Sequence, residues 1–132
     1  VPGAGGAAGD LLGSQPDLEE ALGNVATVGQ LALLLPSPAR PDLRPLVVAN
    51  THLFFHPGAA HVRVLQAHAL LHAARGFRSE HAAASGGAEA PLMLCGDLNA
   101  EPFDAAVDYI KAGGIGAGHR EWVQGSFFRW GG

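Results

Sequence analysis

The sequence is poor in cysteine, in basic residues and in long apolar runs, and each shortage excludes a class of protein. Its one cysteine, Cys95, excludes an intrachain disulfide framework and a cysteine-ligated zinc site. Because Cys95 follows an apolar run, we expect a buried, inert thiol. No run approaches the roughly 18 apolar residues that span a bilayer. The first residues show neither a basic n-region nor an Arg-rich pattern, so we expect no signal or transit peptide in them.

Positive charge is also scarce. Eight Lys and Arg residues face 12 Asp and Glu residues, which gives a net charge of −4 and a pI of about 5.9. This balance lacks the basic footprint of proteins that grip long nucleic acids through phosphates. An enzyme that binds a few nucleotides through a metal stays compatible with it. With 132 residues and 48% hydrophobic residues, the chain is long enough for one domain with a core.

The chain divides into a Gly/Ala-rich start and a patterned remainder. We expect residues 1–23 to form a flexible segment, with a short helix or turn within 10–22, and residues 24–132 to form a partial domain. Apolar runs predict strands at 28–35, 46–53 and 92–95, the first two as an antiparallel hairpin. Helical spacing predicts helices at 60–75 and 103–111, the second with Phe103, Val107 and Ile110 on one face, and a loop at 76–90. Trp122 and Phe127–Phe128 are expected to dock on a core.

This order of elements favours an α/β fold with mixed strand pairing. Three strands make a thin sheet, and long apolar strands need cover on both faces. One long helix and one short helix are insufficient for that cover. We therefore expect the chain to be part of a larger sheet, or to be covered by a partner.

Polar residues follow two of the predicted strands. Asp97 and Asn99 come after the last strand, and Asn50 and His52 close the second. Residues i and i+2 of an extended chain point to the same side. Because the ends of neighbouring strands in a mixed sheet can meet, we expect these four polar side chains to line one crevice. A carboxylate, two amides and an imidazole at the rim of a sheet suit the handling of a water, a metal or a phosphate, which favours a phosphoester-hydrolysing site. The alternative is ordinary strand-end polar residues that bond to loop backbone.

Other candidates are weaker. Pro57 fixes a tight loop near the mouth of this predicted crevice, or is a plain turn proline. His68 and His72 have the i, i+4 spacing of zinc ligands, but no third ligand is evident, so a solvated face is favoured. Arg63 has the reach for an anion, although a surface charge is favoured. Three further histidines are expected to lie in loops, and no partner is predicted for them: His56, His81 and His119.

Three segments in this order resemble the endonuclease/exonuclease/phosphatase superfamily. They are residues 48–57 (VANTHLFFHP), 62–66 (VRVLQ) and 94–102 (LCGDLNAEP). Within the superfamily they are similar to the deadenylase branch, and most to its 2′,5′-phosphodiesterase 12 type. The resemblance extends over roughly 24–122. It implies an αββα sandwich, of which this chain is about half, and magnesium-dependent hydrolysis of RNA phosphodiesters. The activity implied is that of a 3′-exoribonuclease or poly(A) deadenylase, or of a 2′,5′-oligoadenylate phosphodiesterase.

The resemblance also implies roles for the polar residues. The residue matching Asp97 orients or deprotonates the attacking water, and the one matching Asn99 helps to hold that water and the phosphate. The residue matching His52 contacts the scissile phosphate. Asn50 and Pro57 are expected to bind substrate, with Pro57 bordering the nucleotide pocket.

The family's metal-binding glutamate and its last catalytic histidine have no match in this sequence. We therefore expect no metal ligand within this chain and an Mg²⁺ site that is incomplete in it. A second hypothesis is a non-catalytic binding module that retains half of the scaffold, and a third is another substrate, such as DNA, a phosphoinositide or sphingomyelin. The resemblance favours RNA or oligoadenylate over DNA, no membrane partner, and a mitochondrial or cytoplasmic location. It leaves the linkage preference and the oligomeric state open.

Overall fold

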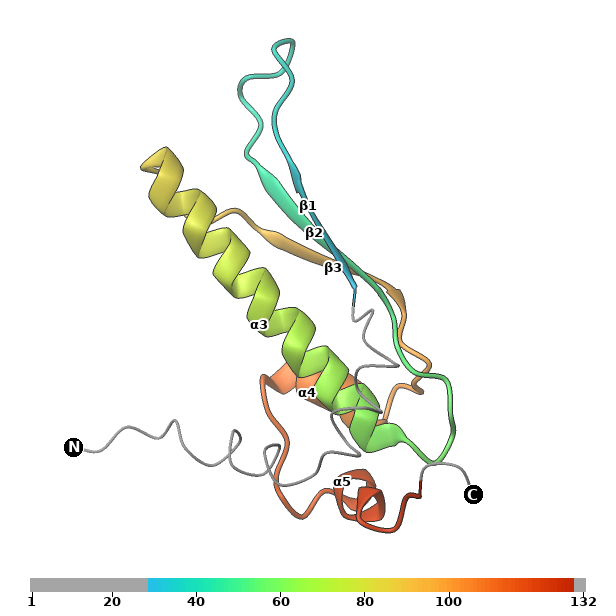
Figure 1. The fold of residues 1–132 in the computed structure, drawn as a ribbon. Coiled ribbons are helices and arrows are strands. Elements are labelled where there is room, and N and C mark those ends of the chain that lie inside the picture. Colours follow the sequence, from blue (N-terminus) through green and yellow to red (C-terminus); the bar gives the residue numbers. More distant parts are fainter. Residues whose placement is uncertain (1–28, 130–132) are drawn as a thin grey trace, which may run out of the picture. The chain divides into compact units, whose positions relative to one another are not determined.

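Three strands form one mixed sheet in a computed structural model that describes residues 29–129. Strand β1 (Gln30–Leu34) pairs antiparallel with β2 (Leu46–His52), and β2 pairs parallel with β3 (Leu92–Asp97) (Figure 1). The sequence prediction of an α/β fold with a hairpin and mixed pairing is confirmed. The flexible segment and the helix predicted within the first 23 residues lie outside the described residues.

Helix α3 (Ala60–Ser85) crosses from β2 to β3 and runs along the sheet (Figure 1). It is longer than predicted, and the predicted loop at 76–90 is wrong over its first ten positions. One glycine inside a helix costs only about 1 kcal/mol, and the residues around Gly76 are good helix formers. The helix ends instead at Gly86, whose left-handed conformation lets its N–H donate to the Ala82 carbonyl.

The core-facing stripe of α3 also differs from the predicted face. Its buried positions include Ala60, Arg63, Ala67, Leu70 and Ala74, which recur at intervals of three and four residues. The apolar spacing predicts one face with Val62, Leu65 and Ala69, joined by Leu70 and Leu71. In the structure Val62 and Leu70 are buried, Leu65 and Leu71 are half-buried, and Ala69 is exposed. Leu70 of this stripe was predicted, whereas a search for large apolar residues missed its alanines and its arginine.

Helix α4 (Ala105–Ala112) ends at the left-handed Gly113. Phe103 precedes the helix and is exposed, so its predicted place on the packed face is wrong. A further helix that the sequence did not predict, α5 (Arg120–Gly125), packs on α3. The buried Glu121 joins α5 to α4, because its Oε2 accepts the Ala105 N–H at 2.7 Å.

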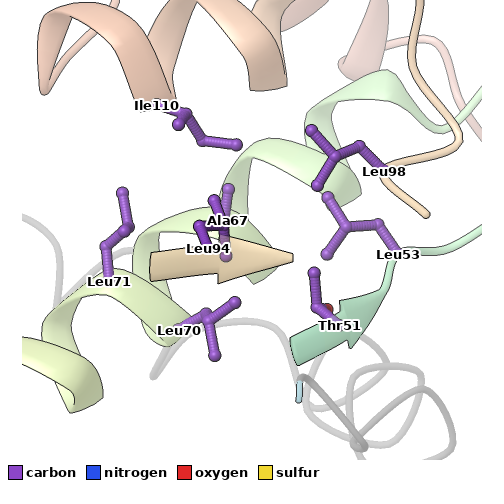
Figure 2. A pocket seen from close by; sticks show the side chains of 8 residues that line it. All are labelled: Thr51, Leu53, Ala67, Leu70, Leu71, Leu94, Leu98 and Ile110. Carbon is purple, nitrogen blue, oxygen red and sulfur yellow. The ribbon is translucent and has the colours of Figure 1, made fainter. Parts of the chain in front are cut away.

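The core lies between one face of the sheet and helices α3 and α4. Alternate residues of β2 and the residue after it face this core: Val47, Ala49, Thr51 and Leu53 are all buried. Figure 2 shows the apolar gap that Thr51 and Leu53 line together with Leu94, Leu98, side chains of α3 and Ile110 of α4. The gap is too small to admit a water molecule, so it belongs to the core and is not a ligand site.

The opposite face of the sheet carries no helix among the described residues. Leu34 and Met93 are about half exposed there, and Val48, the register partner of Met93, is partly exposed. This is the shortage of cover predicted from the three-stranded sheet. Within residues 29–129, no helix is long and apolar enough to cross a membrane.

Candidate active site

The ends of β2 and β3 lie side by side, which brings His52 next to Asp97. The two residues are register partners on the parallel strands, and His52 Nε2 lies 3.8 Å from Asp97 Oδ2. Both side chains are well exposed, at 74% and 66%. An imidazole and a carboxylate therefore lie within reach of one solvent-borne ligand. The predicted meeting of the two strand ends is present in the structure.

Asn99 joins this pair through a turn and not through the extended geometry on which the prediction relied. Strand β3 ends at Asp97, and Asn99 has a φ of 46°. The Asn99 N–H donates to Asp97 Oδ1 at 2.8 Å, and Asn99 Nδ2 donates to the Leu53 carbonyl at 2.6 Å. The turn fixes the Asp97 carboxylate, and the side-chain bond fixes the Asn99 amide.

Leu53 also binds the end of β3 through its own N–H. That N–H donates to the Asp97 carbonyl at 2.9 Å, so both backbone groups of Leu53 bond to the Asp97–Asn99 segment. The side chain of Leu53 is buried in the core cluster with Val64 and Ala67. The site is thereby tied to the interior although its reactive groups face solvent.

Asn50 precedes His52 on the same exposed face of β2 and is the register partner of Cys95. Asn50, His52 and Asp97 therefore share the open side of the sheet, as predicted for Asn50 and His52. Cys95 is only half-buried, so the expected fully buried thiol is wrong. The reason is that Cys95 points to the face without helices.

Pro57 lies in an exposed turn between β2 and α3. The turn is closed by the Ala59 N–H, which donates to the His56 carbonyl at 3.0 Å, and by the Gly58 N–H, which donates to His56 Nδ1 at 3.1 Å. His56 thus has a structural partner that the sequence did not predict. Pro57 lies in this turn, close in sequence to His52. This position fits both sequence interpretations, a plain turn proline and a residue that borders the nucleotide pocket.

Two buried polar residues of α3 hold this segment, and the sequence analysis missed both. Arg63, predicted as a surface charge, has a side chain that is only 5% exposed. Its Nη1 donates to the carbonyls of Phe54 at 3.3 Å and of His56 at 2.9 Å, and its Nη2 lies 4.0 Å from Asp104. Gln66 is also buried, and its Oε1 accepts the Phe54 N–H at 2.9 Å. The sequence feature that indicates the burial of Arg63 is its helical spacing from Ala60 and Ala67, which places the three residues on the core-facing stripe.

Aromatic rings gather on the segment after β2. The ring of Phe128 lies edge-on to those of His56, at 5.2 Å, and His61, at 5.3 Å. Phe55 is exposed beside Phe54. Of the tail that was expected to dock, Phe128 packs on these rings, whereas Trp122 and Phe127 are exposed.

The other histidines do not assemble a metal centre. His68 Nδ1 lies 2.6 Å from the Tyr109 hydroxyl and the ring stacks on His72, in line with the solvated face predicted. His81 lies within α3 and not in a loop, and His119 caps α5 with its Nε2 at 3.7 Å from Asp108. No group of three or more His, Cys, Asp or Glu residues that could hold a metal ion occurs in the described part of the chain.

The site thus offers one carboxylate, one imidazole and two amides at an exposed sheet rim. Mg²⁺ prefers near-octahedral oxygen ligands and usually retains several waters, with one or two carboxylates and substrate phosphates completing its shell. Asp97 alone supplies the carboxylate among these residues. The described residues therefore do not make a complete magnesium site, but they suit contacts to a phosphate and to a water.

This combination of fold and strand-end residues resembles the deadenylase type of the endonuclease/exonuclease/phosphatase superfamily, and curated relatives confirm the resemblance. The chain is 28% identical over 115 residues to 2′,5′-phosphodiesterase 12 of Bos taurus, a match that covers 86% of this chain and 18% of the relative. It is 34% identical over 103 residues to protein angel homolog 1 of Homo sapiens (75% of this chain, 14% of the relative). A third relative is the CCR4-NOT transcription complex subunit 6-like of Danio rerio, 28% identical over 91 residues (64% and 16%).

No protein-family model matches the chain. The chain spans between 14 and 18% of the length of these three relatives.

Proposed function

We propose that this chain contributes His52, Asp97 and Asn99 to the active site of a phosphodiesterase that hydrolyses RNA. The substrate class is poly(A) or a short 2′,5′-linked oligoadenylate. One observation carries the proposal. The parallel register of β2 and β3 sets His52 beside Asp97, and the side chain of Asn99 is bonded to the carbonyl of Leu53, the residue that follows His52. The names of the relatives, which include a 2′,5′-phosphodiesterase, support the reaction class.

The three side chains have complementary roles in this proposal. Asp97 is an exposed carboxylate that accepts a proton from, or orients, the attacking water. His52, within 3.8 Å of it, contacts the phosphate and stabilises the charge that develops there. Asn99, whose Nδ2 is held by the Leu53 carbonyl, presents its amide oxygen in a fixed direction to the water and the phosphate. Asn50 and Pro57 are proposed to contact the substrate beside them.

Magnesium dependence is part of the proposal, although the described residues do not hold the ion by themselves. A bound Mg²⁺ would supply charge neutralisation at the phosphate. A glutamate elsewhere in the complete protein would be its main ligand, as the family resemblance implies. Removing the ion with EDTA should abolish turnover, and adding excess Mg²⁺ should restore it.

The test is an assay of the complete protein encoded by the gene. End-labelled 2′,5′-oligoadenylate, 3′,5′-oligoadenylate and oligodeoxyadenylate are incubated with Mg²⁺, and products are resolved by length. We expect cleavage of a ribo-oligonucleotide and a loss of at least about 100-fold in kcat for Asp97→Asn. The matched control is Asp42→Asn, because Asp42 is an exposed aspartate in the hairpin loop that pairs with Arg40. Absence of turnover, or equal rates for the two variants, contradicts the proposal.

A second candidate is a non-catalytic binding module. It is favoured by the lack of a metal-binding group among residues 29–129 and by the open face of the sheet. In that case oligoadenylate binds with the same affinity in Mg²⁺ and in EDTA, and no product forms. Binding measured by fluorescence anisotropy alongside the cleavage assay separates the two functions.

A further inference from the structure

We propose that Gln66 is a positioning residue for Asn99 and acts through a single peptide unit, with Arg63 securing the backbone that follows. The inference rests on the proposed function, because it assigns Asn99 a part in the reaction. It concerns two residues of α3 that lie behind the site, on the core side of the sheet rim.

The peptide unit between Leu53 and Phe54 is held at both ends. Its carbonyl, on Leu53, accepts from Asn99 Nδ2 at 2.6 Å, and its N–H, on Phe54, donates to Gln66 Oε1 at 2.9 Å. The peptide is trans, so its C=O and N–H point in opposite directions. Any rotation of the plane that breaks the bond to Gln66 also moves the carbonyl away from Asn99. Gln66 therefore fixes the orientation of the Leu53 carbonyl, and through that carbonyl it fixes the position of the Asn99 side-chain amide.

Arg63 secures the next part of the same segment. Its Nη1 donates to the carbonyls of Phe54 and His56, and Asp104, at the start of α4, lies 4.0 Å from its Nη2. The N–H and the C=O of Phe54 are thus both bonded to α3, by two residues one helical turn apart. Leu53 is still bonded to the end of β3 through its N–H, whereas the backbone groups of Phe54 and His56 that follow are held by the side chains of Gln66 and Arg63.

The chemistry of these positions points to placement of the loop and not to core stability alone. Both side chains are at least nine-tenths buried, and burying a guanidinium costs free energy that an apolar side chain of similar size avoids. Arg63 Nε is buried without a hydrogen-bond partner among the described residues, so the cost is only partly offset. The hydrogen bonds of Gln66 and Arg63 fix the backbone segment to which the side chain of Asn99 is bonded.

The test compares two substitutions at one position in the complete protein. Gln66→Met keeps the length of the side chain and removes the acceptor, whereas Gln66→Glu keeps an acceptor oxygen in either protonation state. We expect Gln66→Met to lower kcat by roughly 100-fold with KM changed less than about twofold, because the amide is misplaced and not removed. Gln66→Glu should restore most of kcat. Leu70→Ala, one turn further along the buried stripe, is the control for a general loss of stability.

A double-mutant cycle gives the decisive comparison. If Gln66 acts only through Asn99, then Gln66→Met combined with Asn99→Ala is no slower than Asn99→Ala alone. Additive losses, or a Gln66→Met variant with the kcat of the wild type, overturn the proposal. A kcat of Leu70→Ala as low as that of Gln66→Met overturns it as well, since stability would then explain the effect.

A spectroscopic measurement keeps this inference separate from the proposed function. In ¹⁵N-labelled protein, the side-chain NH₂ signals of Asn99 are identified by their loss in Asn99→Ala. We expect their exchange with water to accelerate by roughly tenfold or more in Gln66→Met and to be unchanged in Leu70→Ala. If the wild type shows no turnover, the proposed function fails and this measurement decides the positioning role by itself: unchanged exchange in Gln66→Met overturns it.

Discussion

Gly96 lies against Thr51 so closely that no β-carbon fits between their backbones. A side chain at Gly96 would overlap the Thr51 carbonyl, and the φ of 127° is one that L-residues rarely adopt. This approach lets β3 run beside β2 up to the last register pair, His52 and Asp97. The glycine in the Gly-Asp-x-Asn sequence thus determines whether the imidazole and the carboxylate meet.

Gly96→Ala should therefore destabilise the protein strongly. The strained backbone and the overlap with Thr51 together cost roughly 2–5 kcal/mol of the free energy of unfolding. Urea denaturation followed by circular dichroism measures the change. The control is Gly114→Ala, since a β-carbon there meets no atom of the described residues within 4 Å. Equal urea midpoints for the two variants would show that the strand ends do not depend on the close approach.

The stability of the protein should also depend on pH through His61. This residue lies at the start of α3 against Phe128, and a β-carbon on Gly125 of α5 would come within 2.5 Å of its Cγ. Burial, and secondarily the nearby charge of Arg63, lower the pKa of His61 below its ordinary value of 6.5. The neutral imidazole is therefore the form that the folded protein prefers.

The sign of the effect follows from linkage. Below a pH of about 6.5 the unfolded chain binds a proton at this position before the folded chain does. The contribution of His61 is thus complete above that pH, declines as the pH falls, and levels off below the lowered pKa of the folded state. His61→Gln should make the fall of the free energy of unfolding between pH 7 and pH 5 less steep. Equal slopes for wild type and His61→Gln would contradict the assignment.

Sequence patterns predicted those elements whose side chains alternate or repeat clearly. Strand β2 was predicted because Val47 and Ala49 lie in a continuous apolar run that ends in polar residues. The extension of α3 was missed because Gly76 was interpreted as a break, although the helix tolerates it. Phe103 was placed on a packed face by its spacing alone, and it precedes the helix that would have buried it.

The candidate site also has a part that the sequence predicted and a part that it did not. His52 and Asp97 were predicted to meet because both end apolar runs, and parallel pairing provides the rest. The roles of Arg63 and Gln66 were not predicted, because a polar residue on a helix ordinarily marks the solvent face. Their burial depends on backbone groups of the segment after β2, which no local pattern encodes. The turn at Asn99 was likewise missed, since a positive φ at a non-glycine residue reflects its bonds to Asp97 and Leu53.

The oxidation rate of Met93 can show whether further residues of the complete protein, or a partner, cover the open face of the sheet. It is 50% exposed, beside Val48 on the face that carries no described helix. The expectation that further sheet or a partner covers this face stays a prediction. If it is right, hydrogen peroxide should oxidise Met93 in the complete protein about tenfold more slowly than in the urea-unfolded chain, because oxidation of methionine follows its exposure.

The measurement is direct because Met93 is the only methionine of this sequence. The sulfoxide is quantified by mass spectrometry of the tryptic peptide that begins at Ser79, and Met93→Leu identifies the signal. An oxidation rate close to that of the unfolded chain would mean that the apolar face is open to solvent in the complete protein. Protection that disappears on dilution would instead assign the cover to a partner, because only cover by the same chain is independent of concentration.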